Sequence, residues 1–139
     1  MNNFKKWYLE NSEISDIPNT PNMVGEVQVS IPKSQSWYSD ARDFSIEGGF
    51  LRVVKNPQAP TDWSVTMTEV DETQRRKGLA TKLIKAMLST INGSIGAQCS
   101  NDGSIKLYWN LGFRLPNNKT FEDALKIRRD MSSVNLIHP

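Results

Sequence analysis

The segment QRRKGLATKLI, residues 74–84, is the part of the chain around which the other predicted elements are arranged. It follows a strand-like run at residues 63–70 and leads directly into a helical pattern. The first N–H groups of a helix have no partner within the helix and carry the positive end of its dipole. A basic loop that opens into a helix therefore favours binding of a phosphate or pyrophosphate. Gly78 has no Cβ, which permits close approach of such a group to the backbone.

The loop does not have the spacing of two well-known phosphate loops. Neither G-x-x-x-x-G-K-[ST] nor a G-x-G-x-x-G that follows a strand is present. Residues 75–80, RRKGLA, resemble instead the acetyl-CoA loop of the GNAT superfamily of N-acetyltransferases, written [R/Q]-x-x-G-x-[G/A]. This short pattern also fits a solvated basic turn at the start of a helix.

A second motif makes the resemblance more specific. Residues 101–113, NDGSIKLYWNLGF, resemble the other signature of the GNAT superfamily, N-x(6)-Y-x-x-x-G-F, and Asn101, Tyr108, Gly112 and Phe113 stand at its spacing. The two motifs occur in the family's order and are joined by a predicted helix and strand. The resemblance therefore covers residues 63–113, the motif core.

Alternating and helical hydrophobic patterns predict the elements. Strands are expected at residues 27–31, 44–46, 51–53, 63–70, 94–99 and 134–137, with Gly48-Gly49 as a hairpin turn. Helices are expected around Phe4, Trp7 and Tyr8, at 79–91 with Asn92-Gly93 as the C-cap, at 102–111, and after a capping box at Thr120 and Asp123. Strict alternation would place Trp63, Val65 and Met67 on one strand face, and the last helix would have Leu125, Ile127 and Met131 as its apolar residues.

Several strands followed by strand, helix, strand and helix predict an α/β (mixed α+β) fold about one sheet. The chain has 139 residues, which predicts a single domain over 1–139. The resemblance implies a GNAT-like fold: a single mixed sheet, flanked by helices, whose central strands splay apart to admit the pantetheine arm of acetyl-CoA. Residues 32–42 are too short and polar for the family's usual pair of helices, and a helical pattern follows Phe113 where a strand hairpin is usual. Both regions shape the acceptor pocket, so the acceptor is the least transferable property.

Composition indicates a polar protein with 37% hydrophobic residues and a mean hydropathy of −0.51. No apolar run has the length of a membrane span, and no apolar core follows the basic N-terminal residues, so neither membrane insertion nor a signal peptide is expected. A single cysteine, Cys99, excludes an internal disulfide and favours the cytoplasm. Residues 1–70 carry six Lys/Arg and nine Asp/Glu, whereas residues 71–139 carry eleven and six, so the basic half holds the phosphate-type loop.

The resemblance implies a set of acetyl-CoA-binding residues. Backbone N–H groups from Arg76 through Thr81 would bind the pyrophosphate, and charged side chains would add to the attraction near it and near the 3′-phosphate. The strand end would offer main-chain groups to the pantetheine and thioester carbonyl. Asn101 would hydrogen-bond the pantetheine arm, a role compatible with that of a helix N-cap. The predicted residues are Glu69, Val70, Arg75, Arg76, Lys77, Gly78, Leu79, Ala80, Thr81 and Asn101.

Tyr108 is the predicted catalytic residue. Acetyl transfer to an amine expels the CoA thiolate, and a phenol near the sulfur would hydrogen-bond or protonate it. The sequence does not identify a general base, for which Glu69, Asp62, Ser64, Thr66 and Thr68 are candidates. Cys99 is expected to be a small buried hydrophobe and His138 to be disordered. No Cys/His cluster predicts a metal site.

Two functions of different classes follow from these observations. The first is an acyltransferase, an acetyl-CoA-dependent N-acetyltransferase, which transfers the acetyl group directly within a ternary complex. The alternative is a non-catalytic CoA- or nucleic-acid-binding module that uses the basic loop 74–82. The acceptor amine is left open between a small molecule, a protein and an aminoacyl-tRNA, and the oligomeric state is left open as well.

Overall fold

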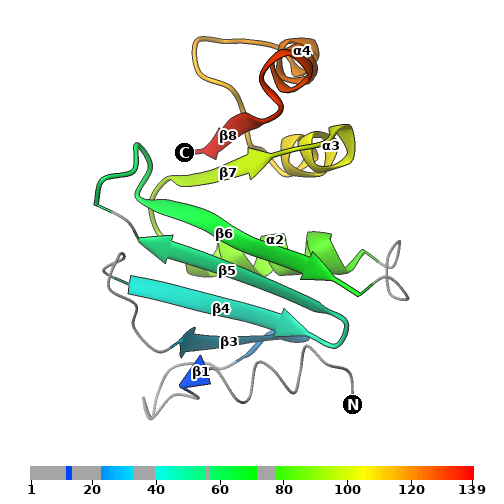
Figure 1. The fold of residues 1–139 in the computed structure, drawn as a ribbon. Helices are drawn as coiled ribbons and strands as arrows, with labels where there is room; N and C mark the ends of the chain where they lie inside the picture. The colour runs from blue at the N-terminus through cyan, green and yellow to red at the C-terminus, as the bar shows by residue number, and fades with distance from the viewer. Residues whose placement is uncertain (1–11, 14–22, 33–39, 56, 72–77) are drawn as a thin grey trace.

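A computed structural model describes residues 12–13, 23–32, 40–55, 57–71 and 78–139 (Figure 1). These residues form one eight-stranded mixed sheet and three helices, which confirms the predicted GNAT-like α/β fold class. The sheet has the order β1-β3-β4-β5-β6-β7-β8, and β2 pairs with β3. All its pairs are antiparallel except β6 with β7. The strands are β1 (Ser12–Glu13), β2 (Met23–Val24), β3 (Val27–Pro32), β4 (Asp40–Ile46), β5 (Gly49–Lys55), β6 (Trp63–Val70), β7 (Ile95–Cys99) and β8 (Val134–His138).

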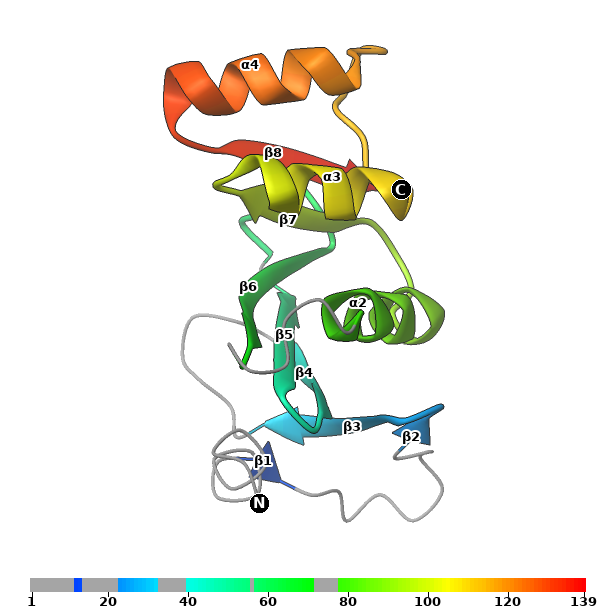
Figure 2. The ribbon, with the colours of Figure 1, turned by 90° about the vertical axis from the view of Figure 1, so that its right-hand side faces the viewer.

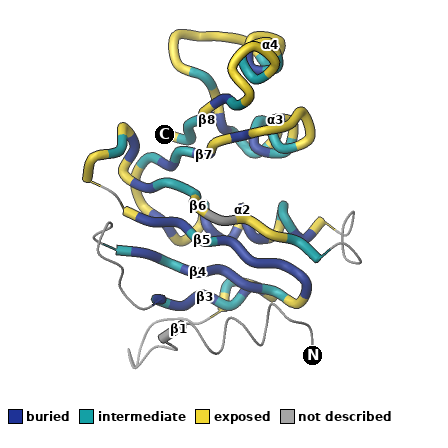
Figure 3. Tube along the Cα trace, in the orientation of Figure 1, coloured by how far each residue is buried: buried dark blue, intermediate teal, exposed yellow. Residues whose placement is uncertain are grey.

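The helices are α2 (Leu79–Thr90), α3 (Asp102–Asn110) and α4 (Phe121–Met131). Helix α2 packs against one face of β3 to β6, α3 packs against β7 and β8, and α4 packs against α3 and β8. Figure 2 shows α2 beside β4, β5 and β6, with α4 at the far end of the molecule beyond β8. The inner face of the sheet and these helices therefore enclose a common core, whose buried path along the central strands is visible in Figure 3.

The apolar stripe predicted for α2 forms the centre of this core. Leu83, Ile84 and Met87 are fully buried and pack in one cluster with Leu51 and other residues of the inner sheet face. Gly49 allows the helix to lie this close, because a Cβ at that position would be 3.0 Å from Cδ1 of Leu83. The helix thus owes its stability mainly to the burial of one face, as is usual for short helices.

Several other predicted elements are confirmed with shifted ends. The hairpin at Gly48-Gly49 joins two strands that are longer than expected, with Ile46 opposite Gly49. Helix α2 ends at Thr90 with Ile91 as an extended C-cap, one residue before the predicted end. The capping box of α4 is present in full, since Thr120 and Asp123 each accept a hydrogen bond from the other's backbone.

Four expectations from the sequence were not met in full or fall outside the described residues. Met131 does not join the apolar face of α4, because it is 71% exposed at the last turn. His138 is ordered in β8 and half-buried, with its ring 5.3 Å from that of Phe113. The helix expected around residues 4–8 lies outside the described residues. Residues 32–42 include the end of β3 and the start of β4, so this segment is not wholly a connection.

Candidate active site

Strands β6 and β7 are paired only at their first residues. Their parallel ladder consists of Trp63 opposite Ile95 and Ser64 opposite Gly96. Beyond these pairs β6 continues to Val70 and β7 to Cys99 without further pairing between them. In Figure 1 the two strands diverge toward their C-terminal ends. The central strands of the sheet therefore splay apart, as the resemblance implied.

The closed end of this splay is fixed by Asp62 and Ser94. Oδ2 of Asp62 accepts hydrogen bonds from the backbone N–H (2.9 Å) and hydroxyl (3.2 Å) of Ser94, and the Ser94 hydroxyl accepts one from the Asp62 N–H (2.9 Å). The bonds from the Ser94 backbone and hydroxyl hold the pKa of Asp62 below its ordinary value. Asp62 is one of the candidate general bases, but these contacts give it a structural role at the end of the splay where the strands meet.

A β-bulge interrupts β6 at Thr66, shortly after Ser64, the last residue that pairs with β7. Val65 lies opposite Val53 of β5, whereas Met67 lies opposite Arg52, so that Thr66 is an extra residue on β6. A bulge reverses the faces on which the following side chains lie. The strict alternation predicted for residues 63–70 is therefore wrong beyond Val65.

The bulge determines which face of the sheet each later β6 residue occupies. Thr68 lies opposite Leu51, a residue of the core beneath α2, and so belongs to the helix-covered face. Glu69 lies opposite Phe50 and belongs to the other face. Both residues are exposed. No feature of the residue types in β6 indicated this change of face.

Tyr108 extends from α3 toward β6. The residue is 5% exposed, and its ring makes an edge contact with Phe113, with centroids 4.9 Å apart and an interplanar angle of 76°. Burial raises the pKa of the Tyr108 phenol above its ordinary value of 10.0, whereas the nearby Thr68 and Cys99 side chains have smaller effects that lower and raise it, respectively. The phenol is therefore protonated at neutral pH and lies beside the residues of β6 that have no partner on β7.

Cys99 ends β7 beneath the first turn of α3. It is fully buried, as expected, near the side chain of Ser104. Burial raises the pKa of its thiol from 9.0 to about 11, so the thiol is neutral at physiological pH.

Asn101 is the N-cap of α3. Its Oδ1 accepts a hydrogen bond from the backbone N–H of Ser104 at 2.8 Å, and the Ser104 hydroxyl donates to the Asn101 carbonyl at 2.9 Å. The capping role of Asn101 is thus present, whereas its contact with the pantetheine arm stays a prediction.

The N-terminus of α2 has the features of an anion site. Gly78, the N-cap, has φ 72° and ψ 18°, which is the left-handed conformation that glycine adopts most easily. No side chain caps this end, and its first turn contains no acidic residue. Among the described residues, the backbone N–H groups of Leu79, Ala80 and Thr81 have no hydrogen-bond acceptor, and the first bond of the helix runs from the Lys82 N–H to the Gly78 carbonyl (3.0 Å). A Cβ built on Gly78 would have no atom within 4 Å, so the space beside it is open.

The other predicted cofactor residues are placed in part. Val70 and Glu69 end β6, and Figure 1 shows that α2 begins at the same end of the sheet. Arg75, Arg76 and Lys77 lie outside the described residues.

Two cavities border the central elements. The first cavity has a volume of about 240 Å³ and lies where β6 and β7 separate. Its lining includes Gly96 and Gln98, which alternate along β7 with the buried residues of the helix-covered face. The cavity therefore opens on the face of the sheet away from α2. Neutral residues line it: Pro60, Thr61, Ser64, Val65, Gly96, Ala97, Gln98, Asn135 and Ile137.

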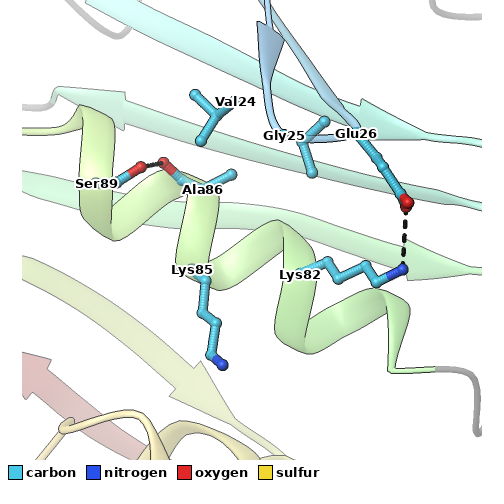
Figure 4. Close-up of a pocket in the computed structure, with 8 residues that line it drawn as sticks. Val24, Gly25, Glu26, Lys82, Lys85, Ala86 and Ser89 are labelled. Atoms are coloured by element: carbon cyan, nitrogen blue, oxygen red, sulfur yellow. Dashed lines mark hydrogen bonds and ion pairs between the residues drawn. The ribbon is translucent and has the colours of Figure 1, made fainter.

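The second cavity, about 430 Å³, lies between the β2–β3 turn and the outer side of α2. Figure 4 shows Lys82 paired with Glu26 at one end of it, with Nζ and Oε2 3.0 Å apart, and Val24 facing Ala86. Glu26 therefore offsets part of the positive charge of the basic loop predicted at residues 74–82.

Two further features concern the described residues as a whole. No group of three or more His, Cys, Asp or Glu side chains among them is arranged to bind a metal ion. None of their helices combines the length and hydrophobicity that a bilayer crossing requires.

Comparison with known proteins supports the resemblance to the GNAT superfamily. Residues 48–113, which include both sequence motifs, match the model of the "Acetyltransferase (GNAT) family". The crystal structure of Escherichia coli ElaA is similar to 73% of this chain and 70% of that chain, with 14% sequence identity and a TM-score of 0.53, a likeness that concerns the fold. The sequence has no significant match among curated proteins. Residues 48–113, which carry both motifs and most of the splayed strands, thus match the GNAT acetyltransferase family.

Proposed function

We propose that this protein transfers an acetyl group from acetyl-CoA to an amine acceptor, directly within a ternary complex. The observation that carries the proposal is the divergence of β6 and β7 beyond Ser64 and Gly96, with the protonated phenol of Tyr108 beside the gap. The match of residues 48–113 to the GNAT family supports acyl transfer in general. Direct transfer needs no protein nucleophile, which agrees with the neutral, buried state of Cys99.

The residues around the open end of the splay fit acetyl-CoA. The unpaired N–H groups at the start of α2, together with the left-handed Gly78, suit a pyrophosphate. Arg75, Arg76 and Lys77 would add positive charge there. On the side facing β7, the backbone of β6 has no strand partner beyond Ser64, so main-chain groups up to Glu69 and Val70 are available to the pantetheine arm. Asn101 would contact the same arm from the start of α3.

Acetyl-CoA supplies the activated acyl group as a thioester. The protein's own contribution is to hold the acceptor in line and to provide a proton where the thiolate departs. Tyr108 is the proposed donor, because the burial that raises its pKa keeps the phenol protonated. The expected contribution of such a general acid is about 10²–10⁴-fold in rate.

The acceptor is proposed to approach through the 240 Å³ cavity on the face away from α2. Ser64, Gln98 and Asn135 line this cavity with neutral polar groups, and no charged side chain of the described residues lines it. Its volume is below that of typical ligand pockets, about 300–1,000 Å³. This lining favours an acceptor whose reactive end is small and uncharged apart from the amine.

Glu69 is the proposed general base among the candidates left open by the sequence. It pairs with Phe50 of β5, and Ser64 pairs with Val54, so Glu69 and Ser64 share the sheet face on which the cavity opens. Thr68 lies on the opposite face, and Asp62 is engaged with Ser94. Glu69 would accept the amine proton directly or through water.

The test is a thermal-shift measurement with acetyl-CoA, CoA and short oligonucleotides, followed by detection of free thiol with a panel of amines. Acetyl-CoA at about a hundred times its Kd is expected to stabilise the fold by about 2.7 kcal/mol. Thiol release that depends on a small amine would support the acetyltransferase. Stabilisation by oligonucleotides without any effect of acetyl-CoA would support the nucleic-acid-binding alternative and overturn this proposal.

A further inference from the structure

We propose that Gln98 and Asn135 form an amide pair that selects the acceptor, and that the preferred acceptor is an amine carrying a neutral carboxamide. This inference rests on the proposed acetyl transfer and deepens it, because it assigns a chemical class to the molecule that enters the 240 Å³ cavity. Two neighbouring strands supply the pair, Gln98 from β7 and Asn135 from β8. The pair therefore depends on the fold and not on a sequence motif.

The register of β7 and β8 places the two amides side by side. Gln98 lies directly opposite Asn135 in the antiparallel ladder, and both residues are exposed and line the cavity. Side chains in such opposite positions have their Cβ atoms about 4.5–5.5 Å apart. Gln98 follows Gly96, the last residue of β7 that pairs with β6, so the amide pair borders the part of the gap in which the strands diverge. It lies on the sheet face that also carries the proposed base, Glu69.

The hydrogen bonds of the pair leave groups available for a ligand. Nε2 of Gln98 donates to the Ser133 hydroxyl at 2.9 Å, which orients this amide. Within the described part of the chain, neither Oε1 of Gln98 nor the side-chain amide of Asn135 has a hydrogen-bond partner. The pair thus presents a carbonyl acceptor beside a second, complete amide that has both a carbonyl and an NH2 group.

These groups match a carboxamide better than other substituents of an amine. A carboxamide has an acceptor and a donor side by side, so it can donate to one amide of the pair and accept from the other. A carboxylate would lose water without meeting a cation, and a second ammonium would meet no carboxylate, since the described lining residues are all neutral. An apolar group would displace water from the pair and leave its amides without partners. Because the cavity is small, the amine and the carboxamide should be only a few bonds apart.

The experiment measures thiol release from acetyl-CoA with short amines that differ mainly in one group. Glycinamide carries the carboxamide, free glycine a carboxylate, ethanolamine a hydroxyl, propylamine an apolar end and ethylenediamine a second amine. Each rate is referred to the concentration of neutral amine, because these compounds differ in basicity. Glycinamide is expected to have a kcat/KM about tenfold above that of each other amine, the equivalent of one ordinary hydrogen bond.

Two substitutions at nearly constant shape test whether the amide pair causes this preference. Gln98→Glu and Asn135→Asp each place a negative charge in the cavity, so kcat/KM for ethylenediamine should rise about tenfold relative to that for glycinamide. Gln28→Glu is the matched control, because Gln28 lies on β3, which β4, β5 and β6 separate from β7, and does not line the cavity. If the two cavity variants change the order of the amines no more than Gln28→Glu does, the pair does not select the acceptor.

A binding measurement separates this inference from the proposed function. The side-chain amide signals of Gln98 and Asn135, followed by NMR with CoA present, should shift with glycinamide and much less with propylamine, whether or not transfer occurs. If glycine, ethanolamine or propylamine is acetylated as well as glycinamide, the carboxamide assignment is wrong while the acetyltransferase function stands. If no amine is acetylated, the proposed function fails. Amide signals that do not respond to glycinamide then overturn this inference as well, whereas shifted signals support the binding of a carboxamide.

Discussion

Gly93 lies so close to Asp62 that a Cβ at its position would be 2.7 Å from Oδ2 of that carboxylate. Gly93 also has φ 110°, a conformation that side chains with a Cβ rarely adopt. The carboxylate is the group that binds the N–H and hydroxyl of Ser94 at the closed end of the splay. The glycine is therefore required for the turn and for the contact that fixes the spacing of β6 and β7.

Gly93→Ala is accordingly expected to lower the free energy of unfolding by about 1–3 kcal/mol, through backbone strain and displacement of Asp62. Urea denaturation would measure this as a lower midpoint at an unchanged slope. Gly25→Ala is the matched control, because Gly25 has φ 60° but a Cβ there would have nothing within 4 Å. If the two variants are equally destabilised, the contact with Asp62 contributes nothing beyond the strain.

The Asp62 carboxylate also predicts a pH dependence of stability. Because hydrogen bonds from Ser94 lower its pKa in the folded state, its contribution is present above the unfolded value of 3.8 and is lost as the pH falls through the lower folded value. Asp62→Asn should lower Tm at pH 7, and the difference from the parent should shrink as the pH falls below about 4. Asp123 has a lowered pKa for the same kind of reason, so acid destabilisation should persist in the variant. A Tm difference that is constant from pH 7 to pH 2 would contradict this account.

The sequence predicted much of the fold and less of the site. Three features were predictable because their physical causes lie within short segments of the chain. They are the apolar stripe of α2, the hairpin turn at Gly48-Gly49 and the capping box of α4. The face on which Thr68 lies could not be predicted, because a bulge depends on how β6 pairs with β5. The His138 contact with Phe113 is likewise set by tertiary packing.

The anion site proposed at the start of α2 can be tested with Gly78→Asp and Gly78→Asn. Both side chains tolerate the left-handed conformation of this residue and both cap helices well, so the two variants should have similar stability. They have nearly the same shape and differ in one negative charge. Gly78→Asp is expected to weaken CoA binding at least tenfold relative to Gly78→Asn. The reason is that repulsion between the aspartate carboxylate and the pyrophosphate should make the binding free energy less favourable by more than about 1.4 kcal/mol at this partly shielded helix end.

Isothermal titration with CoA at two salt concentrations would measure this difference. Screening weakens interactions between exposed charges, so the gap between the variants should narrow at high salt. Equal CoA affinities for the two folded variants would mean that the phosphates lie elsewhere.

Asn101 offers a way to separate helix capping from cofactor contact. Asn101→Ala should cost about 1 kcal/mol of stability by removing the acceptor for the Ser104 N–H, whereas Asn101→Ser should retain most of the cap. The shorter serine side chain extends less far than the asparagine amide toward a ligand. If Asn101 contacts the pantetheine arm, Asn101→Ser will bind CoA more weakly at nearly parental Tm. If its only role is the cap, Asn101→Ser will bind CoA as the parent does.

Tyr108→Phe separates the chemistry of transfer from cofactor binding. The substitution keeps the ring and its edge contact with Phe113 and removes only the hydroxyl. A leaving-group acid acts mainly in the transition state, so kcat should fall by about 10²–10⁴-fold while the Kd for CoA changes little. Steady-state kinetics with an amine identified in the acceptor screen, together with CoA titration, would measure the two quantities.

The competing explanation is that Tyr108 is only a core aromatic. It is 5% exposed, so Tyr108→Ala should leave a cavity and cost about 3–5 kcal/mol, whatever the residue does in catalysis. Unfolding of the alanine variant therefore decides nothing about the acid, and the phenylalanine variant must carry the test. If Tyr108→Phe turns over like the parent, the thiolate departs with the help of water or another group. The splay of β6 and β7 would remain the proposed place of the cofactor in that case, but Tyr108 would no longer be the proposed acid.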